Sequence, residues 1–158
     1  MKKLFLIFIL ALPFKDLASQ SFDLKSIDFE VGDVYVSCPP IFFHFNKYEI
    51  LPRSEAILDS IANFLLENEN LVLEVGYHTD GRGSEHYSRR LDQKRAESIV
   101  ASLVEKGVSA DRLVAKGYGG TQPIVSNSEI QKMESDQQKE EAHATNRRTE
   151  FKIIKINR

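Results

Sequence analysis

The sequence contains a single cysteine and no tryptophan, and its net charge is close to zero. One cysteine excludes an internal disulfide and a zinc site built from several thiolates of one chain. The net charge of −2 gives no support for a nucleic-acid partner, because nucleic-acid-binding domains usually carry a clustered basic excess. The 158 residues are too few for a porin-sized barrel and fit one domain with a short leader.

Long apolar runs are also lacking, since the longest one, at the N-terminus, covers only Leu4–Leu12. As a helix this run would rise about 14 Å, which is roughly half of the hydrocarbon core of a membrane. Lys2 and Lys3 precede the run and small residues such as Ser19 follow it, as in a secretory signal peptide. We therefore predict a signal peptide over residues 1–20 and export to the periplasm. A buried N-terminal strand or helix is the alternative.

The remaining chain alternates between strand-like and helix-like patterns. Residues 21–40 are predicted to form an N-terminal strand and linker region, and residues 41–158 the domain proper. The apolar run Ile41–Phe45 predicts a buried strand, and Asp92 is predicted to begin or cap the second helix. The predicted strands lie within residues 28–37, 41–45, 71–75, 113–118 and 151–156, and the predicted helices over 52–67 and 92–106.

The alternation of these elements predicts the fold class. Strands on both sides of a helix favour parallel pairing through right-handed crossovers. We expect an α/β (α+β) fold, a two-layer sandwich with a mixed β-sheet, helices on one face and a βαβαβ core. The pattern leaves the direction of the last strand open. It also leaves open whether the acidic insert, residues 126–145, is a helix or a mobile insertion.

Titratable residues concentrate in the Gly-containing stretch after the strand at 71–75. His78 and Asp80 lie in this stretch, and Arg95 follows on the next helix. Ligands commonly bind in loops at the carboxyl ends of strands in α/β sheets. A solvated loop with a helix cap is the alternative. The zinc-protease helix motif, the GxSxG elbow and the phosphate-loop spacing are all absent, so we predict no enzyme, no metal and no cofactor.

Short motifs follow one another in a fixed order over residues 41–156. They are Phe43-His44-Phe45-Asn46-Lys47, His78-Thr79-Asp80 with Gly83, Tyr87, Leu91, Arg95-Ala96, Gly117-Tyr118-Gly119, Pro123 and Asn146-Arg147-Arg148. The ordered set resembles the OmpA-like C-terminal (peptidoglycan-binding) domain family. Its detail is most similar to members from Bacteroidetes-type bacteria.

This resemblance implies non-covalent binding of peptidoglycan through the diaminopimelate of the stem peptide. Asp80 stands at the family's acidic ligand position and Arg95 at its basic one. A carboxylate can accept the ligand's ammonium, and a guanidinium can hold its carboxylate with two bonds. We expect the two side chains to offset each other's charge in the empty pocket, and a structural salt bridge is the alternative. The ligand residues implied are Asp80, Arg95, Asn46, Thr79, Ser88, Asn146 and Arg147.

A second function remains open on the sequence alone. The domain could be a periplasmic adaptor in an envelope protein complex, with wall binding secondary or lost. The acidic insert is the candidate surface for such an outer-membrane or envelope partner, against a solvated segment without a partner.

Overall fold

The computed structural model describes residues 4–6 and 29–157, and its five strands form one mixed sheet in the order β1-β2-β5-β3-β4. The strands are β1 (Leu4–Leu6), β2 (Val34–Val36), β3 (Leu71–His78), β4 (Leu113–Gly119) and β5 (Arg148–Ile156). The helices are α1 (Glu55–Glu67), α2 (Glu85–Glu105), α3 (Asn127–Ile130) and α4 (Asp136–Asn146), with single 3₁₀ turns at Pro52–Ser54 and Ala110–Arg112.

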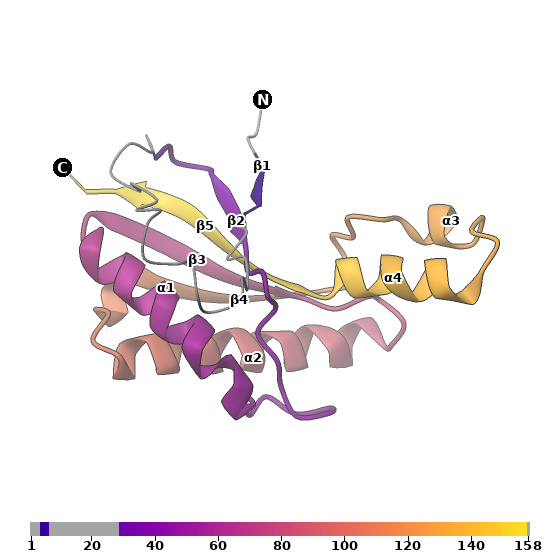
Figure 1. Ribbon diagram of the computed structural model, residues 1–158, viewed down its shortest axis with the longest axis horizontal. Helices are drawn as coiled ribbons and strands as arrows, with labels where there is room; N and C mark the ends of the chain where they lie inside the picture. The colour runs from indigo at the N-terminus through magenta and orange to yellow at the C-terminus, as the bar shows by residue number, and fades with distance from the viewer. Residues whose placement is uncertain (1–3, 7–28, 158) are drawn as a thin grey trace, which may run out of the picture.

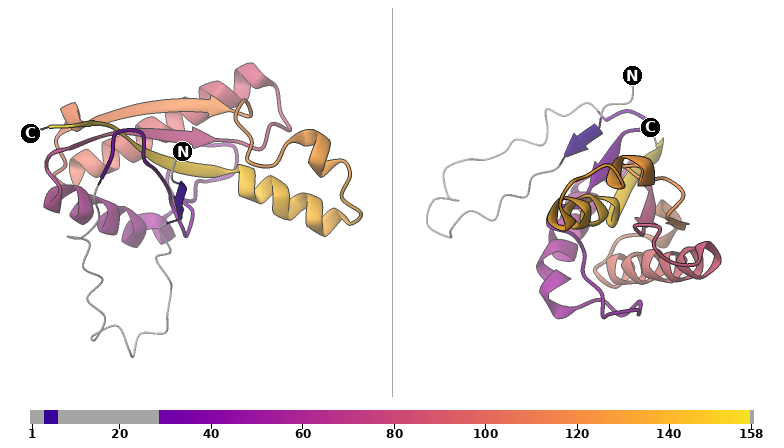
Figure 2. Two further views of the ribbon diagram at one scale, coloured as in Figure 1. Left: turned by 90° about the horizontal axis from the view of Figure 1, so that it is seen from above. Right: turned by 90° about the vertical axis from the view of Figure 1, so that its right-hand side faces the viewer.

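The sheet and the two long helices form two layers. Strand β3 runs parallel to β4 and antiparallel to β5, which also pairs antiparallel with β2. Helices α1 and α2 lie side by side beneath the sheet, whereas α3 and α4 project beyond one end of it (Figures 1 and 2). The predicted α/β two-layer sandwich is therefore confirmed, and the last strand, whose direction was open, is antiparallel to both of its neighbours.

The core lies between these layers, where apolar side chains recur on the inner faces. On β3, alternate residues point toward the helices, as the period of a strand requires. Helices contribute residues at three- and four-residue spacing. The least exposed members include Leu58 and Leu65 from α1, Leu71 and Val75 from β3, Ile99 and Leu103 from α2, and Ile153 from β5.

Two sequence predictions about local structure are wrong. Ile41–Phe45 is a loop that makes only an isolated bridge between Phe43 and Ile50, because a tight turn follows it directly. Helix α2 begins at Glu85, seven residues before the predicted start. Asp92 is therefore a buried residue of the helix interior and not its cap. The helical spacing of apolar residues becomes regular only after the first two turns, so it marked the start of α2 too late.

A buried arginine ties the beginning of β3 to the end of α1. Arg112 donates from Nε to the Leu71 carbonyl at 2.9 Å. Its Nη2 donates to the carbonyls of Leu65 and Asn68, both at 2.8 Å. The last carbonyls of a helix have no partner within the helix, and a cation there also complements the helix dipole. Arg112 thus holds the end of α1 and the beginning of β3 together.

Helix α2 packs against β4 at Gly117 with no room for a side chain. A Cβ atom at Gly117 would lie 2.2 Å from the Gln93 nitrogen, so only glycine permits this approach. The Gln93 side chain accepts a hydrogen bond from the Gly117 N–H at 2.8 Å and donates to the Ala115 carbonyl at 3.3 Å. These contacts fix the position of α2, and with it the residues that α2 carries toward the end of β3.

The predicted leader lies mainly outside the described residues. Its three described residues form β1, which pairs parallel with β2. Residues 1–3 and 7–20 are not described, so the signal peptide over 1–20 stays a prediction. Over the ranges 4–6 and 29–157, no helix is both long enough and apolar enough to cross a membrane.

Candidate functional site

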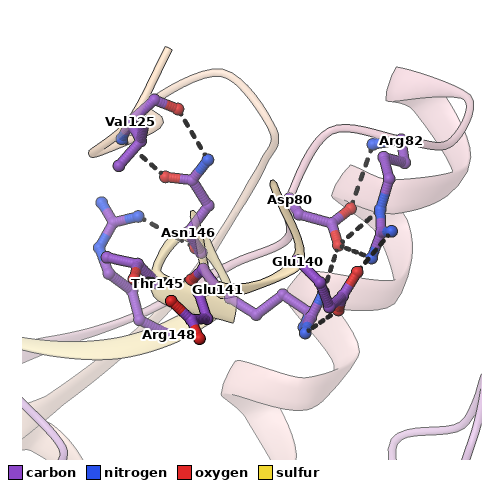
Figure 3. Close-up of polar contacts among 9 residues, drawn as sticks. Asp80, Arg82, Val125, Glu140, Glu141, Thr145, Asn146 and Arg148 are labelled. Carbon is purple, nitrogen blue, oxygen red and sulfur yellow. Dashed lines mark hydrogen bonds and ion pairs between the residues drawn. The ribbon is translucent and has the colours of Figure 1, made fainter. Parts of the chain in front are cut away.

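The predicted ligand residue Asp80 lies just after β3, within a network of charged side chains (Figure 3). Its Oδ2 accepts from Arg147 Nη1 at 2.6 Å, from Arg82 Nη2 at 2.7 Å and from Arg82 Nε at 3.1 Å. Oδ1 accepts from the Arg82 backbone N–H at 3.2 Å. Glu140 of α4 bonds both arginines, at 2.9 Å to Arg82 and 2.8 Å to Arg147.

The charges of this network keep Asp80 ionised. Partial burial raises the pKa of Asp80, but hydrogen bonds from Arg82 and Arg147 outweigh this effect and lower the pKa to about 2. Hydrogen bonds from the same two arginines lower the pKa of Glu140. The site therefore presents a carboxylate, and not a carboxylic acid, throughout the physiological pH range.

Two loops meet backbone to backbone beneath Asp80. Gly81 has a φ of 76°, and a Cβ atom at Gly120 would lie 2.3 Å from the Gly81 Cα. The Thr79 N–H donates to the Gly119 carbonyl at 3.1 Å. Glycines at both positions allow the loop after β3 to rest on the loop after β4, and this contact fixes the backbone that carries Asp80.

The second principal ligand residue, Arg95, is held by an aromatic wall. Its Nε donates to the Lys47 carbonyl at 2.9 Å. The guanidinium carbon lies 5.1 Å from the Phe43 ring centroid and 5.2 Å from that of Tyr77, both within cation–π range. Burial raises the pKa of Tyr77, whereas the charges of Arg95 and Arg147 act to lower it. Tyr77 therefore lies within the electrostatic reach of both arginines.

Asp80 and Arg95 do not neutralise each other directly, which corrects the sequence prediction. No hydrogen bond or ion pair joins them within the described part of the chain. Asp80 has Arg82 and Arg147 as its partners, and Arg95 has the Lys47 carbonyl and two aromatic rings. The bond to the Lys47 carbonyl uses Nε of Arg95, and a side-chain hydrogen bond from Arg95 also acts to lower the pKa of Tyr77.

Asn46 lies in the exposed turn that packs on α2. Its φ of 58° is in the left-handed region, which asparagine adopts more readily than most residues. Its Oδ1 accepts a hydrogen bond from the Tyr87 hydroxyl at 2.9 Å. The neighbouring Phe45 is 95% exposed. The turn is thus fastened to the first part of α2 and presents polar and aromatic groups beside Arg95.

The hydroxyl groups of Ser88 and Thr79 lie too deep in the site to contact a ligand. Ser88 is a buried residue of α2. The Thr79 hydroxyl is inaccessible and lies near the carboxyl group of Asp92. Burial raises the pKa of Asp92 to about 7, although Arg95 and polar groups of Gly119 and Thr79 oppose it. Those polar groups do not reach good hydrogen-bond geometry with either carboxyl oxygen.

Asn146 does not face the site, although it was predicted as a ligand residue. It is fully buried, and its Oδ1 accepts from the N–H groups of Ile124 and Val125 at 2.8 and 2.9 Å (Figure 3). Its Nδ2 donates to the Val125 carbonyl at 2.8 Å. Asn146 therefore anchors the loop before α3, and it fixes the chain from which Arg147 reaches Asp80.

Arg148 points away from Asp80, as the alternation of neighbouring strand residues predicts. It donates to Glu150 at 2.7 Å and to the Gln122 carbonyl at 3.0 Å. Only Arg147 of the two arginines reaches Asp80, and Arg148 is buried as part of the scaffold.

The histidines near Asp80 do not form a metal site with it. His78 is buried and stacks on Tyr118, with 4.5 Å between the ring centroids, and its Nε2 lies 3.3 Å from Glu150. Burial raises the pKa of Glu150, but His78 and Arg148 outweigh it and lower the pKa to about 2. Across residues 4–6 and 29–157, no group of three or more His, Cys, Asp or Glu side chains is arranged to hold a metal ion.

Sequence reasoning missed three residues of the site. They are Arg82, Glu140 and Tyr77. Glu140 lies 58 residues from Arg82 in sequence. No local pattern connects them. The one available signal is the high proportion of acidic residues in the insert, any of which can pair with a cationic side chain from elsewhere in the fold.

Comparison with known proteins gives the same assignment for most of the chain. The model of the OmpA family matches residues 42–137. The peptidoglycan-associated lipoprotein of Buchnera aphidicola is 31% identical over 109 residues, which cover 69% of this chain and 57% of that protein. This chain thus matches little more than half the length of that relative.

Solved structures share the fold. An outer membrane protein from Borrelia burgdorferi superposes with a TM-score of 0.59 at 24% identity, over 83% of this chain and 95% of that one. The peptidoglycan-associated lipoprotein of Burkholderia pseudomallei gives 0.57 at 25% identity, over 71% and 86%. These relatives bear the names of envelope proteins and not of enzymes, in agreement with the prediction that the chain is no enzyme. The family resemblance predicted from the motifs is confirmed, and the chain belongs to the OmpA family.

Proposed function

We propose that this protein binds peptidoglycan non-covalently, through the diaminopimelate of the stem peptide, and so tethers the envelope to the cell wall. Family membership supports the general role, as does a relative named for its association with peptidoglycan. The same relatives support a place in the periplasm or at the outer membrane.

The observation that carries the proposal is the ionised carboxylate of Asp80, which lies in a network with Arg82, Arg147 and Glu140. Diaminopimelate offers an ammonium and a carboxylate on one carbon at its free end. A carboxylate with a pKa of about 2 stays ionised at neutral pH and can accept a charge-assisted hydrogen bond from the ammonium. The guanidinium group of Arg95 can hold the ligand carboxylate in a planar, two-bond geometry.

The residues that we propose to contact ligand are fewer than the sequence predicted. Asp80 and Arg95 provide the two charges, and Asn46 and Arg147 lie at the rim. Thr79, Ser88 and Asn146 are assigned to the support of the site, because their side chains are buried or already bonded to the protein.

Co-sedimentation with purified sacculi tests this proposal. Asp80→Asn and Arg95→Gln remove one charge each while keeping side-chain size, and both variants should no longer pellet with the sacculi. Glu69→Gln is the matched control, because Glu69 is an exposed acid just before β3, at the far end of that strand from Asp80. Wild-type pelleting by both Asp80→Asn and Arg95→Gln would overturn the proposal.

The adaptor role remains the second candidate, and the shape of the insert favours it. Helices α3 and α4 project from the end of the sheet (Figure 1). An open hollow of about 490 Å³ is lined by α4 and by the segments that flank α3. An adaptor should still recover its envelope partner in a pull-down when Asp80 and Arg95 are both substituted. Deletion of residues 128–143 should abolish that recovery.

A further inference from the structure

Asp80 is already occupied in the free protein by the protein's own cations. Three of its four hydrogen bonds end on Oδ2, and Arg82 supplies two of those three. Arg82 adds the fourth bond through its backbone N–H to Oδ1. An incoming ammonium therefore meets a carboxylate whose charge is shared between two guanidinium groups.

The two guanidinium groups differ in how firmly they are held. Arg147 follows the fully buried Asn146 and directly precedes β5, and its side chain is 38% exposed. Arg82 lies in the loop between β3 and α2, with a glycine on each side, and its side chain is 50% exposed. Arg82 is thus the partner of Asp80 that can move into solvent with little change elsewhere.

Glu140 gives Arg82 an acceptor outside the site. Arg82 uses Nη1 for Glu140 and uses Nε and Nη2 for Asp80. The Glu140 side chain is 55% exposed on α4, whereas that of Asp80 is 12% exposed. When Arg82 leaves Asp80, one of its bonds to the protein can therefore persist on the solvent side of the site.

We propose that Arg82 competes with the ammonium of the ligand for Asp80 and so determines which ligands the site accepts. This inference rests on the proposed function. A ligand with both an ammonium and a carboxylate can replace Arg82 on Asp80 while Arg95 holds its carboxylate. A ligand with a carboxylate alone leaves Arg82 in place and gains nothing from Asp80.

The expected effect follows from the strength of a solvent-exposed ion pair. Such pairs contribute little because water screens them and the side chains must be ordered. Removing Arg82 should tighten the binding of an ammonium ligand by about two- to fivefold. It should leave unchanged the binding of a ligand whose amine has been neutralised.

Calorimetric titration with two synthetic peptides tests the competition. One is a stem tripeptide that ends in diaminopimelate. The other is the same peptide acetylated on the side-chain amine of diaminopimelate. Arg82→Gln should bind the first peptide more tightly than wild type and the second peptide equally. Arg82→Lys, which keeps a cation, should return to the wild-type affinity for the first. Arg90→Gln is the charge-matched control, because Arg90 is an exposed residue of α2.

The outcomes separate this inference from the proposed function. Weaker or unchanged binding of the free-amine peptide by Arg82→Gln would overturn the competition, and so would an equal gain for both peptides. Asp80→Asn must lose the free-amine peptide in either background. If it binds like wild type, the proposed function fails and the competition fails with it.

Discussion

Arginine side chains close both ends of β3, and they do so in different ways. At the beginning of the strand, Arg112 is 8% exposed and donates to three main-chain carbonyls. At the other end, Arg82 and Arg147 are partly exposed and donate to the carboxylates of Asp80 and Glu140. Buried carbonyls depend on a hydrogen-bond donor from the protein, whereas side-chain carboxylates at the surface can exchange their partners. The same guanidinium chemistry thus stabilises one end and leaves the other able to bind.

We expect the largest change in the free energy of unfolding for Asp92. This residue is an exception to the contrast between the two ends of β3, because it is a buried ionisable group at the binding end. Its pKa of about 7 lies above the unfolded value of 3.8, so the folded protein binds this proton more tightly. The resulting stability is complete below pH 3.8 and is lost as the pH rises through 7. Relative to Asp92→Asn, the wild type should lose about 4 kcal/mol of unfolding free energy between pH 4 and pH 8.

Urea denaturation of both proteins at several pH values measures this difference directly. Other titrating groups are common to the two proteins and cancel. A difference that does not vary with pH would show that Asp92 is not protonated in the fold.

Arg112→Ala should give the next largest effect, confined to stability. It leaves three buried carbonyls without a donor, and we expect a loss of about 3 kcal/mol in the free energy of unfolding. The midpoint of urea denaturation measures this loss. The remaining folded protein should bind sacculi as wild type does. A loss well below 1 kcal/mol would mean that water replaces the guanidinium, and the contrast between the two ends would weaken.

Arg82→Gln should give the smallest effect on stability. Its bonds are solvent-exposed ion pairs, so we expect the free energy of unfolding to change by less than about 1 kcal/mol. The same denaturation experiment applies. A loss that approaches that of Arg112→Ala would show that Arg82 is part of the scaffold and would remove the distinction between a fixed and an exchangeable end.

Regular elements of the fold could be predicted from the sequence, because their signals are local. The apolar spacing of α1, the run that forms β3 and the glycine after α2 each lie within a few residues of the structure they specify. The prediction of a strand at Ile41–Phe45 is wrong because an apolar run fixes neither the backbone conformation nor the burial of each of its residues. In that loop, Ile41 is buried while Phe45 is almost fully exposed.

The charged site could be predicted only in part. Asp80 and Arg95 are near each other in sequence and belong to motifs of the family. Their actual partners are set by chain folding over long separations, since Arg147 lies 67 residues beyond Asp80. Burial is a second quantity that residue identity does not reveal. Asn146 and Asp92 look like surface polar residues in the sequence, and both are fully buried.

The contact between α2 and β4 has a consequence for association between molecules. Strand β4 lies at the edge of the sheet, and an unpaired edge is a template on which another chain can add a strand. The Gln93 side chain occupies the outward N–H of Gly117 and the outward carbonyl of Ala115, and thus mimics the main chain of a missing neighbour. A single glutamine amide thereby occupies two main-chain groups of this edge to which a strand of another molecule would otherwise bond.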